Sequence, residues 1–293
     1  MNEFARIEPS WRKGYPVEFY RFVRNNDFWR YNTSDRILTM DTPSEVNEAY
    51  SSLAITRERI QQGTERNKLT LSITLPRDAE VAELWHPYPT SSPVGLTIFG
   101  GHLPEGIDFM DSSEVEDKIS DVSVVWIGRV VSPKFKPETL TLLCEPSTTL
   151  ARKSGQTQCW QRGCMHVLYK QGAGLCNANR DDFKITAIVD FANNIRVDFN
   201  DLSGVPNGRL AGGYIEWETL DGNIERRSIN AHDGNSINIT YGTIDLPNGT
   251  EVSLFPGCRH NYDDCNGYFN NGPNYGGDLY SPERSPFNGL PVF

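Results

Sequence analysis

Short runs of alternating apolar and polar residues, separated by turn signals, fill most of this chain of 293 residues. Leu69, Leu71, Ile73 and Leu75 alternate with polar residues, which is the period of a strand with one buried face. In the second half, clusters of Gly, Asn and Asp recur between such runs and are typical of tight turns. The pattern therefore predicts a mainly β fold with few short helices.

The first half of the chain is predicted to form a β-rich region. Residues 14–42 contain three short runs that we expect to form strands joined by turns, and residues 78–87 are expected to form one short helix. Two later runs, 122–133 and 140–146, are apolar almost throughout, which is typical of strands buried on both faces. A polar stretch follows them, so we expect residues 1–152 to form this first region.

The second region, residues 153–293, is expected to begin with a helix over 159–170, where apolar residues recur at helical spacing. Residues 183–255 are predicted to form an antiparallel β-meander, because turn signals separate its strands. The tail after residue 258 is rich in Gly, Asn and Pro and poor in apolar side chains. We expect other contacts to hold this irregular tail, because it cannot offset its own ordering entropy.

Charge and composition argue against several classes of protein. The chain has 28 Lys and Arg against 38 Asp and Glu, a net charge of −10. This balance argues against a protein whose task is to grip DNA or an anionic membrane. With no apolar run of about 18 residues and no apolar leader, we expect a protein made in the cytosol. Glu216 and Glu218 share one face of a strand, and we interpret them as a solvated pair rather than as glycosidase acids.

Cysteines carry the clearest chemical signal. The chain has six of them: Cys144, Cys159, Cys164, Cys176, Cys258 and Cys265. An even number is compatible with three disulfides, but without a secretion signal a metal or iron–sulfur centre is the better interpretation. Cys144 lies inside a predicted strand, and we interpret it as core packing. We interpret His166, beside Cys164, as a helix-surface residue or one that packs behind a metal ligand.

Two pairs of cysteines could form such a centre. Cys164 and Cys176 have eleven residues between them, and Cys258 and Cys265 have six. Four thiolates from two distant segments can close a site for zinc or for an iron–sulfur cluster. Neither pair has the tight spacing of a zinc ribbon, and wider spacing suits a cluster whose corner irons lie apart. Free cysteines that pack as small apolar side chains are the alternative.

Two cysteine-containing motifs resemble a known family. The first is QRGCMHVLYKQGAGLCNAN at 161–179, and the second is FPGCRHNYDDCNGYFNNGPNYGGDLYSP at 255–282. Both resemble segments of phage tail-tip hub proteins, a family that includes minor tail protein L of phage lambda and the hub protein of gene transfer agents. The order of the strand motifs PVGLTIF, VVWIGRVV and LLCEP in the first half resembles the same family.

The resemblance implies a structural virion protein without an active site, located at the tail tip of a siphophage and assembled in the host cytoplasm. It implies a homotrimeric baseplate hub that links the distal tail ring to the central fibre protein. Such a hub surrounds the channel of the tape measure protein and of DNA, which passes without specific binding. No membrane anchor is implied.

The resemblance also implies a [4Fe–4S] cluster in the C-terminal region. Carried over by motif, its ligands are Cys164, Cys176, Cys258 and Cys265, with Cys159 as the reserve candidate for the first ligand. The residues QGAG widen the first pair relative to the family pattern. A zinc-stapled binding module and a redox or metallo-enzyme that uses the four-cysteine centre are the alternative functions.

The apolar run at 122–133 bears on association. A sheet that contains it needs cover on two sides, and the first region has little helix to provide the second cover. We expect a neighbouring copy or a ring of another tail protein to supply it, because closed rotational symmetry buries such surfaces. The alternative is that the loop 101–121 folds back over the sheet.

Overall fold

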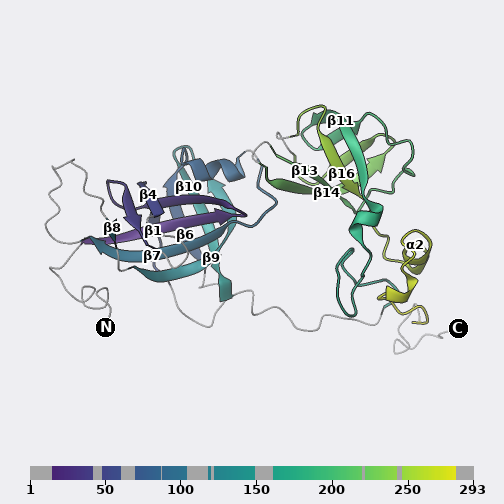
Figure 1. Cartoon of the computed structure of the whole chain (residues 1–293), viewed down its shortest axis with the longest axis horizontal. Coiled ribbons are helices and arrows are strands. Elements are labelled where there is room, and N and C mark those ends of the chain that lie inside the picture. The colour runs from purple at the N-terminus through teal and green to yellow at the C-terminus, as the bar shows by residue number, and fades with distance from the viewer. Residues whose placement is uncertain are drawn as a thin grey trace, which may run out of the picture. The chain divides into compact units, whose positions relative to one another are not determined.

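A computed structural model describes residues 15–41, 48–60, 70–86, 88–103, 118–119, 122–148, 161–219, 222–242 and 246–281. The chain divides into two compact units, Met1–Lys153 and Ser154–Phe293, and each is described by itself (Figure 1). Cys159, residues 104–117 of the acidic loop and residues 282–293 lie outside the described residues. Within the described ranges, no helix is both long and apolar enough to cross a membrane.

The first unit is a sheet, and the expectation of a mainly β fold is confirmed. Its strands are β1 (Tyr15–Arg24), β2 (Asp27–Asn32), β3 (Leu38–Met40), β4 (Glu48–Ser52), β5 (Thr56–Arg57), β6 (Leu71–Pro76), β7 (Gly95–Leu103), β8 (Lys118–Ile119), β9 (Ser123–Phe135) and β10 (Thr139–Pro146). Their order is β5-β6-β10-β9-β7-β1-β2-β4-β3-β8. Neighbours pair antiparallel except β2 with β4 and β3 with β8, which pair parallel.

Two local predictions in this unit are confirmed. β1 and β2 form a hairpin across a two-residue turn at Asn25 and Asn26, and Asn25 has a φ of 52°. Asn tolerates this left-handed conformation better than most residues, which suits it to the turn. The short helix expected at 78–87 exists as η2 (Glu80–Trp85), a 3-10 helix. It buries Val81, Ala82 and Trp85 against the sheet, because these residues fall on one side of it.

The sheet packs two apolar cores, one on each side of β1. The larger core includes Tyr20, Phe22, Leu71, Ile73, Leu75, Leu96, Ile98, Trp126, Leu140, Leu142 and the fully buried Cys144. The smaller core contains Val17, Phe19, Leu38, Met40, Tyr50, Phe99 and Ile119. Val17 and Phe19 of β1 reach the smaller core and Tyr20 and Phe22 the larger one, since successive side chains of a strand point to opposite faces. Cys144 therefore lies where its interpretation as core packing places it.

Within the described part of this single chain, β9 is buried on one face, so the cover expected for its second face does not come from the described residues of this unit. Trp126 and Val130 face the larger core, whereas Val124, Ile127 and Val131 are each at least 50% exposed. A register shift opposite Ile98 and Phe99 lets β9 bulge there, yet only one of its faces meets a core. An apolar sequence therefore produced a strand with one buried and one exposed face.

The second unit contains a closed barrel of six antiparallel strands, in the order β11-β12-β15-β14-β13-β16. The strands are β11 (Ile185–Asn193), β12 (Arg196–Phe199), β13 (Tyr214–Glu218), β14 (Ile224–Asp233), β15 (Ser236–Ile239) and β16 (Glu251–Phe255). The predicted meander is wrong in its topology, because β12 pairs with β15 and β13 pairs with β16. An open sheet would leave two unpaired edge strands, and closure of the barrel removes them.

Two irregular segments flank the barrel in the sequence and lie side by side at one end of it (Figure 1). We call residues 161–179 the first cysteine segment and residues 256–281 the second cysteine segment. A short 3-10 helix, η4 (Arg180–Phe183), leads from the first segment into β11. The second segment carries the six-residue helix α2 (Tyr262–Gly267) and the 3-10 turn η5 (Gly272–Asn274).

The helix predicted over 159–170 is absent from its described part, 161–170. Tyr169 has a φ of 62°, which no right-handed helix accommodates, and Val167 is 66% exposed. The amide of Cys164 donates to the carbonyl of His260 at 2.8 Å instead of to a helical partner. Contacts with the second cysteine segment therefore override the helical spacing of the apolar residues.

Candidate functional site

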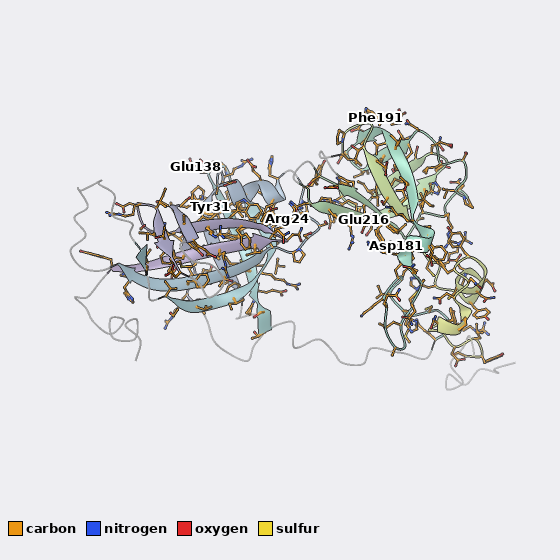
Figure 2. The ribbon with its side chains drawn as sticks, viewed as in Figure 1. Arg24, Tyr31, Glu138, Asp181, Phe191 and Glu216 are labelled. Atoms are coloured by element: carbon orange, nitrogen blue, oxygen red, sulfur yellow. The ribbon has the colours of Figure 1, made fainter. Side chains whose placement is uncertain are left out.

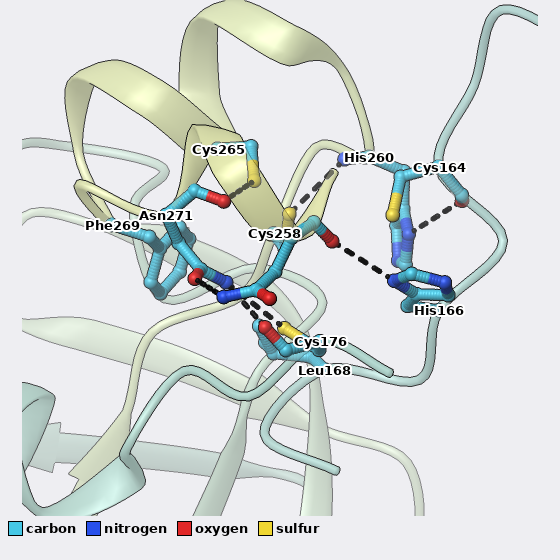
Figure 3. Close-up of a pocket in the computed structure, with 10 residues that line it drawn as sticks. Cys164, His166, Leu168, Cys176, Cys258, His260, Cys265, Phe269 and Asn271 are labelled. Carbon is cyan, nitrogen blue, oxygen red and sulfur yellow. Dashed lines mark hydrogen bonds between the residues drawn. The ribbon is translucent and has the colours of Figure 1, made fainter. Parts of the chain in front are cut away.

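The four cysteines singled out from the sequence line one pocket in the second unit (Figure 3). The pocket contains about 300 Å³ of unfilled space and is partly open to solvent. Its lining residues are Cys164, His166, Leu168, Cys176, Cys258, His260, Cys265, Phe269, Asn271 and Asn274. Cys164 and Cys176 come from the first cysteine segment, and Cys258 and Cys265 come from the second. The fold thus brings together thiols that lie more than eighty residues apart in the sequence.

The first cysteine segment is fixed by an unusual backbone and by aromatic contacts. Asn177, which follows Cys176, has a φ of 55°, and its carbonyl side-chain oxygen accepts from the amide of Gly172 at 2.7 Å. The hydroxyl of Tyr169 donates to the carbonyl of Pro256 at 2.8 Å. The ring of Tyr169 also meets Phe183 and other aromatic rings of the barrel end. This segment is therefore attached to the barrel end by a tyrosine rather than by an element of regular structure.

The second cysteine segment is organised around α2. Asn261 caps this helix, because its side-chain oxygen accepts from the amide of Asp264 at 2.8 Å. Cys265 is buried on α2, and its thiol donates to the carbonyl of Asn271 at 3.3 Å. The buried Asn271 amide group donates to the carbonyl of Cys176 at 2.5 Å. Asn271 therefore connects a cysteine of each segment.

Two backbone amides donate to cysteine sulfurs in the pocket. The amide of His260 donates to Sγ of Cys258 at 3.3 Å, and the amide of Gly276 donates to Sγ of Cys164 at 3.3 Å. Amide donors of this kind stabilise negative charge on sulfur, and they tune metal centres that thiolates hold. The side-chain amide of Asn271 also donates to Sγ of Cys176 at 3.7 Å, so three of the four described sulfurs have an oriented donor.

An ion pair that the sequence analysis missed anchors the second segment to the barrel. Arg209, in the loop before β13, forms two hydrogen bonds to the carboxylate of Asp264, and both side chains are only 8% exposed. Arg209 also donates to the carbonyl of Gly257 at 2.7 Å and lies 3.5 Å from the ring centre of Tyr268. The sequence contains no local signal for this pair, because its two residues are far apart in the chain.

Burial would raise the pKa of Asp264, but Arg209 and the amide of Arg259 together hold that pKa below its ordinary value. The carboxylate is therefore charged at neutral pH. Asp264 thus connects α2 to the barrel through Arg209.

A second anchor is the close approach of two glycines. A Cβ atom on Gly257 would lie 2.0 Å from the carbonyl oxygen of Ala211, and one on Gly213 would lie 2.0 Å from the carbonyl oxygen of Phe255. Only residues without a side chain fit where these backbones cross. The start of the second segment is therefore pressed directly against the loop before β13.

Burial is the main influence on the thiols. It raises the pKa of Cys265 to about 11, with the proximity of Cys258 and Cys164 acting in the same direction. Burial also raises the pKa of Cys258, although the amide of His260 opposes it. Four thiolates so close together repel one another, and a bound cation would reverse this because it deprotonates the thiols that coordinate it. Cys258 and Cys265 thus favour the neutral thiol until positive charge enters the pocket.

The donor set fits a thiolate-bound metal centre. Cys164, Cys176, Cys258 and Cys265 are all free, and among the cysteines that the structure describes they alone line the pocket. In the described parts of the chain, no three or more His, Cys, Asp or Glu side chains are already close enough to hold a single metal ion. The four thiols therefore surround a shared space without closing on one point.

Two other sequence candidates lie elsewhere. Glu216 is buried on β13 and pairs with Arg180 and Arg226, whereas Glu218 is exposed (Figure 2). The interpretation of these glutamates as a solvated pair is therefore wrong for Glu216, because two arginines enclose its carboxylate. Cys144 is in the first unit, within the larger core.

Comparisons with known proteins bear on this second unit and on the fold. Residues 208–284 match the family described as "Phage conserved hypothetical protein BR0599", and this stretch includes the whole second cysteine segment. An uncharacterized protein of Xylella fastidiosa (strain 9a5c) is 26% identical over 199 residues, which are 64% of this chain and 37% of that protein. The chain thus spans little more than a third of that relative.

A solved structure matches along the whole chain. It is a chain of the virion of the native gene transfer agent (GTA) particle, with a TM-score of 0.68, 14% identity and 100% coverage of both chains. The chain therefore has the fold of that virion component. Together with the family match, this fold supports a phage tail-related protein, the class that the cysteine motifs indicated.

Proposed function

We propose that this chain is a structural virion protein of a siphophage tail tip, a baseplate hub stapled by a [4Fe–4S] cluster. The observation that carries the proposal is the convergence of Cys164, Cys176, Cys258 and Cys265 on one pocket. The whole-chain likeness to a gene transfer agent virion component supports the structural role.

The chemistry of the pocket favours a cluster over one zinc ion. A single tetrahedral ion draws its four sulfurs to about 2.3 Å from one point, which leaves no space between them. The four thiols here line one pocket, and no three of the described His, Cys, Asp or Glu side chains are close enough to hold a single ion, which suits a centre with four separate corners. When bound, such a cluster supplies four strong iron–thiolate bonds; the chain supplies the thiolates and the amide donors of His260 and Gly276.

The role of the cluster would be structural. The second cysteine segment buries few apolar side chains, so its ordering entropy must be offset by other bonds. A link from Cys258 and Cys265 back to Cys164 and Cys176 closes a long loop and makes ligand binding part of the folding free energy. No step of catalysis is assigned to the chain, and the hub would act by holding other proteins in place.

The partners follow from the proposed role. A hub would form a threefold ring between the distal tail ring and the central fibre protein, around the path of the tape measure protein and DNA. The net charge of −10 suits a channel that must not retain phosphates. Residues 1–152 would contact the tube and the neighbouring copies, and the exposed apolar residues Val124, Ile127 and Val131 of β9 are a surface such a neighbour would cover.

The first test is the metal content of the full chain purified without oxygen. We expect a brown protein with about four irons and matching sulfide per chain, and a broad absorption band in the visible. Cys258→Ala should remove the iron, whereas Cys144→Ala should keep it, because Cys144 packs in the core of the first unit and does not line the pocket. Stoichiometric zinc in a colourless protein would refute the cluster and leave a zinc-stapled module.

The second test concerns the virion. Cryo-electron microscopy of assembled tail tips should place three copies of this chain around the tail axis. A single off-axis copy, a sixfold ring or absence from the particle would refute the hub. This outcome does not depend on the metal, so the two parts of the proposal can fail separately.

A further inference from the structure

Two histidines connect the cysteine segments in opposite directions (Figure 3). His260, on the second segment, has Nδ1 at 3.0 Å from the carbonyl oxygen of Cys164 on the first. His166, on the first segment, has Nδ1 at 3.1 Å from the carbonyl oxygen of Asn274 on the second. We call this reciprocal pair of contacts the histidine clasp.

The tautomer of both rings follows from these contacts. A carbonyl oxygen only accepts hydrogen bonds, so Nδ1 of each ring must carry the proton and donate it. Each ring lies along the wall of the pocket, since both histidines line it.

Each half of the clasp ends beside a cysteine sulfur. The ring of His260 contacts the carbonyl of Cys164, and the backbone amide of His260 donates a hydrogen bond to Sγ of Cys258. The ring of His166 packs on Gly276, where an added Cβ would lie 2.5 Å from Nε2, and the amide of Gly276 donates to Sγ of Cys164. The clasp therefore fixes the two amides that face sulfur.

We propose that His166 and His260 are positioning residues of the four-cysteine centre: they align the amides of Gly276 and His260 with the sulfurs of Cys164 and Cys258. This inference rests on the proposed function in that the four cysteines bind a metal centre. Neither histidine is a ligand in this proposal. Groups that orient metal ligands from behind typically change metal affinity about 10- to 100-fold when removed.

The backbone conformation of His260 determines which substitutions remove its ring without disturbing the chain. Its φ of 58° is left-handed, which Gly and Asn adopt readily and Ala does not. His260→Gly keeps the backbone conformation and removes the ring, and His260→Asn keeps the conformation and returns a shorter side-chain donor. His166→Ala removes the other ring at a position where no left-handed conformation is involved, and His166→Asn restores a donor there.

The first measurement uses the full chain loaded with iron and sulfide. In His166→Ala and His260→Gly, we expect loss of the cluster to a chelator to be about 10-fold faster or more than in wild type. We also expect a more negative reduction potential, because fewer amides stabilise the reduced cluster. His166→Asn and His260→Asn should recover part of both properties. Wild-type potential and lifetime in both ring-removing variants would overturn the proposal.

The second measurement uses the full chain without metal. Hydrogen exchange followed by mass spectrometry should show faster exchange in peptides that contain Gly276 when His166 is replaced by alanine. Peptides of the β11–β16 barrel should be unchanged. Unchanged exchange at Gly276 would overturn the clasp even if wild type binds a cluster. If wild type binds no metal, the proposed metal centre is refuted. Exchange at Gly276 still tests whether the ring of His166 holds that amide in place.

The matched control is His86→Ala. His86 is exposed and lies in the first unit, where its ring meets Phe135. It should change neither cluster lifetime nor exchange at Gly276. If this variant accelerates cluster loss as much as His166→Ala does, the effect is not specific to the clasp and the proposal is wrong.

Discussion

The barrel and the two cysteine segments of the second unit are held together by different means. The barrel encloses fourteen buried apolar residues in one core, whereas the cluster formed by the segments contains three, Cys176, Ala178 and Phe269. Each fully buried large apolar side chain contributes about 1.5–3 kcal/mol, so the barrel can be stable by packing alone. The segments depend on hydrogen bonds, one buried ion pair and the thiols. The difference teaches that one unit can contain a part stabilised by an apolar core and a part stabilised mainly by polar contacts.

The largest effect is expected from Cys258→Ser. This change should remove the metal centre and leave residues 161–179 and 256–281 with almost no amide protection, while β11–β16 keep theirs. In virions, Cys258→Ser or Cys265→Ser should prevent formation of intact tail tips. Hydrogen exchange of the full chain measures the first effect, and electron microscopy of particles measures the second.

Normal infectivity and intact tips in either cysteine variant would contradict the stapling role. A barrel that unfolds together with the segments would contradict the division drawn above. In that case the two parts would form one cooperative unit, and the metal would stabilise both.

The next effect is expected from Arg209→Ala. It leaves the carboxylate of Asp264 buried without its cation, which typically costs about 3–5 kcal/mol. The free energy of unfolding from urea titration measures the loss. Arg196→Ala is the matched control, since Arg196 is 61% exposed in its pair with Asp198 and should cost about 1 kcal/mol or less. Equal losses of unfolding free energy in the two variants would show that the buried ion pair stabilises the fold no more than the exposed one.

The same ion pair predicts a dependence on pH. The native pKa of Asp264 is lower than its ordinary value of 3.8, so the folded state binds its proton less readily than the unfolded state. Its contribution to stability is complete above about pH 4 and is lost as the pH falls through the lower native pKa. The difference in stability between wild type and Arg209→Ala should therefore shrink below pH 4. A difference that grows on acidification would refute this assignment.

A smaller effect is expected from Gly257→Ala. The added Cβ would collide with the carbonyl oxygen of Ala211, and the strain should cost about 1–3 kcal/mol. Gly267→Ala is the control, because a Cβ there meets nothing within 4 Å. Thermal unfolding of the two variants under identical conditions provides the comparison. Equal melting temperatures would show that the crossing of the two backbones relaxes without cost.

The smallest effect is expected from Cys144→Ala, a change in the first unit that leaves a small cavity and should cost about 1 kcal/mol. Burial raises the pKa of Cys144 to about 12, so its thiol should also be the slowest of the described cysteines to react with an alkylating reagent. Mass spectrometry after timed alkylation at pH 8 follows all of them together. Rapid labelling of Cys144 in the native chain would contradict its burial.

Local patterns predicted local structure well in this chain. Strict alternation identified β6, apolar residues on one side identified η2, and the His-Asp-Gly-Asn signal marks the turn between β14 and β15, where Gly234 has a φ of 58°. Each of these features depends on neighbours within a few residues. The sequence contains all that is needed to specify them.

Features that depend on distant partners were predicted less well. The pairing of β12 with β15 follows from closure of the barrel, which no single strand encodes. The helical spacing around Cys164 was overridden because Tyr169 and the backbone of Cys164 bond to the second cysteine segment. Convergence of the four cysteines was anticipated from motifs, but the ion pair of Arg209 with Asp264 was not. Neither of these residues stands in a recognisable spacing.

The position of the barrel between the two cysteine segments has a consequence for synthesis on the ribosome. Residues 177–257 separate Cys176 from Cys258, and a bacterial ribosome adds about 5–20 residues per second. The first two thiols thus wait about 4–16 seconds before their partners are made, while the strands between them emerge. During that interval they are open to oxidants and to competing metals. The pocket can therefore close only after every strand of the barrel has been synthesised.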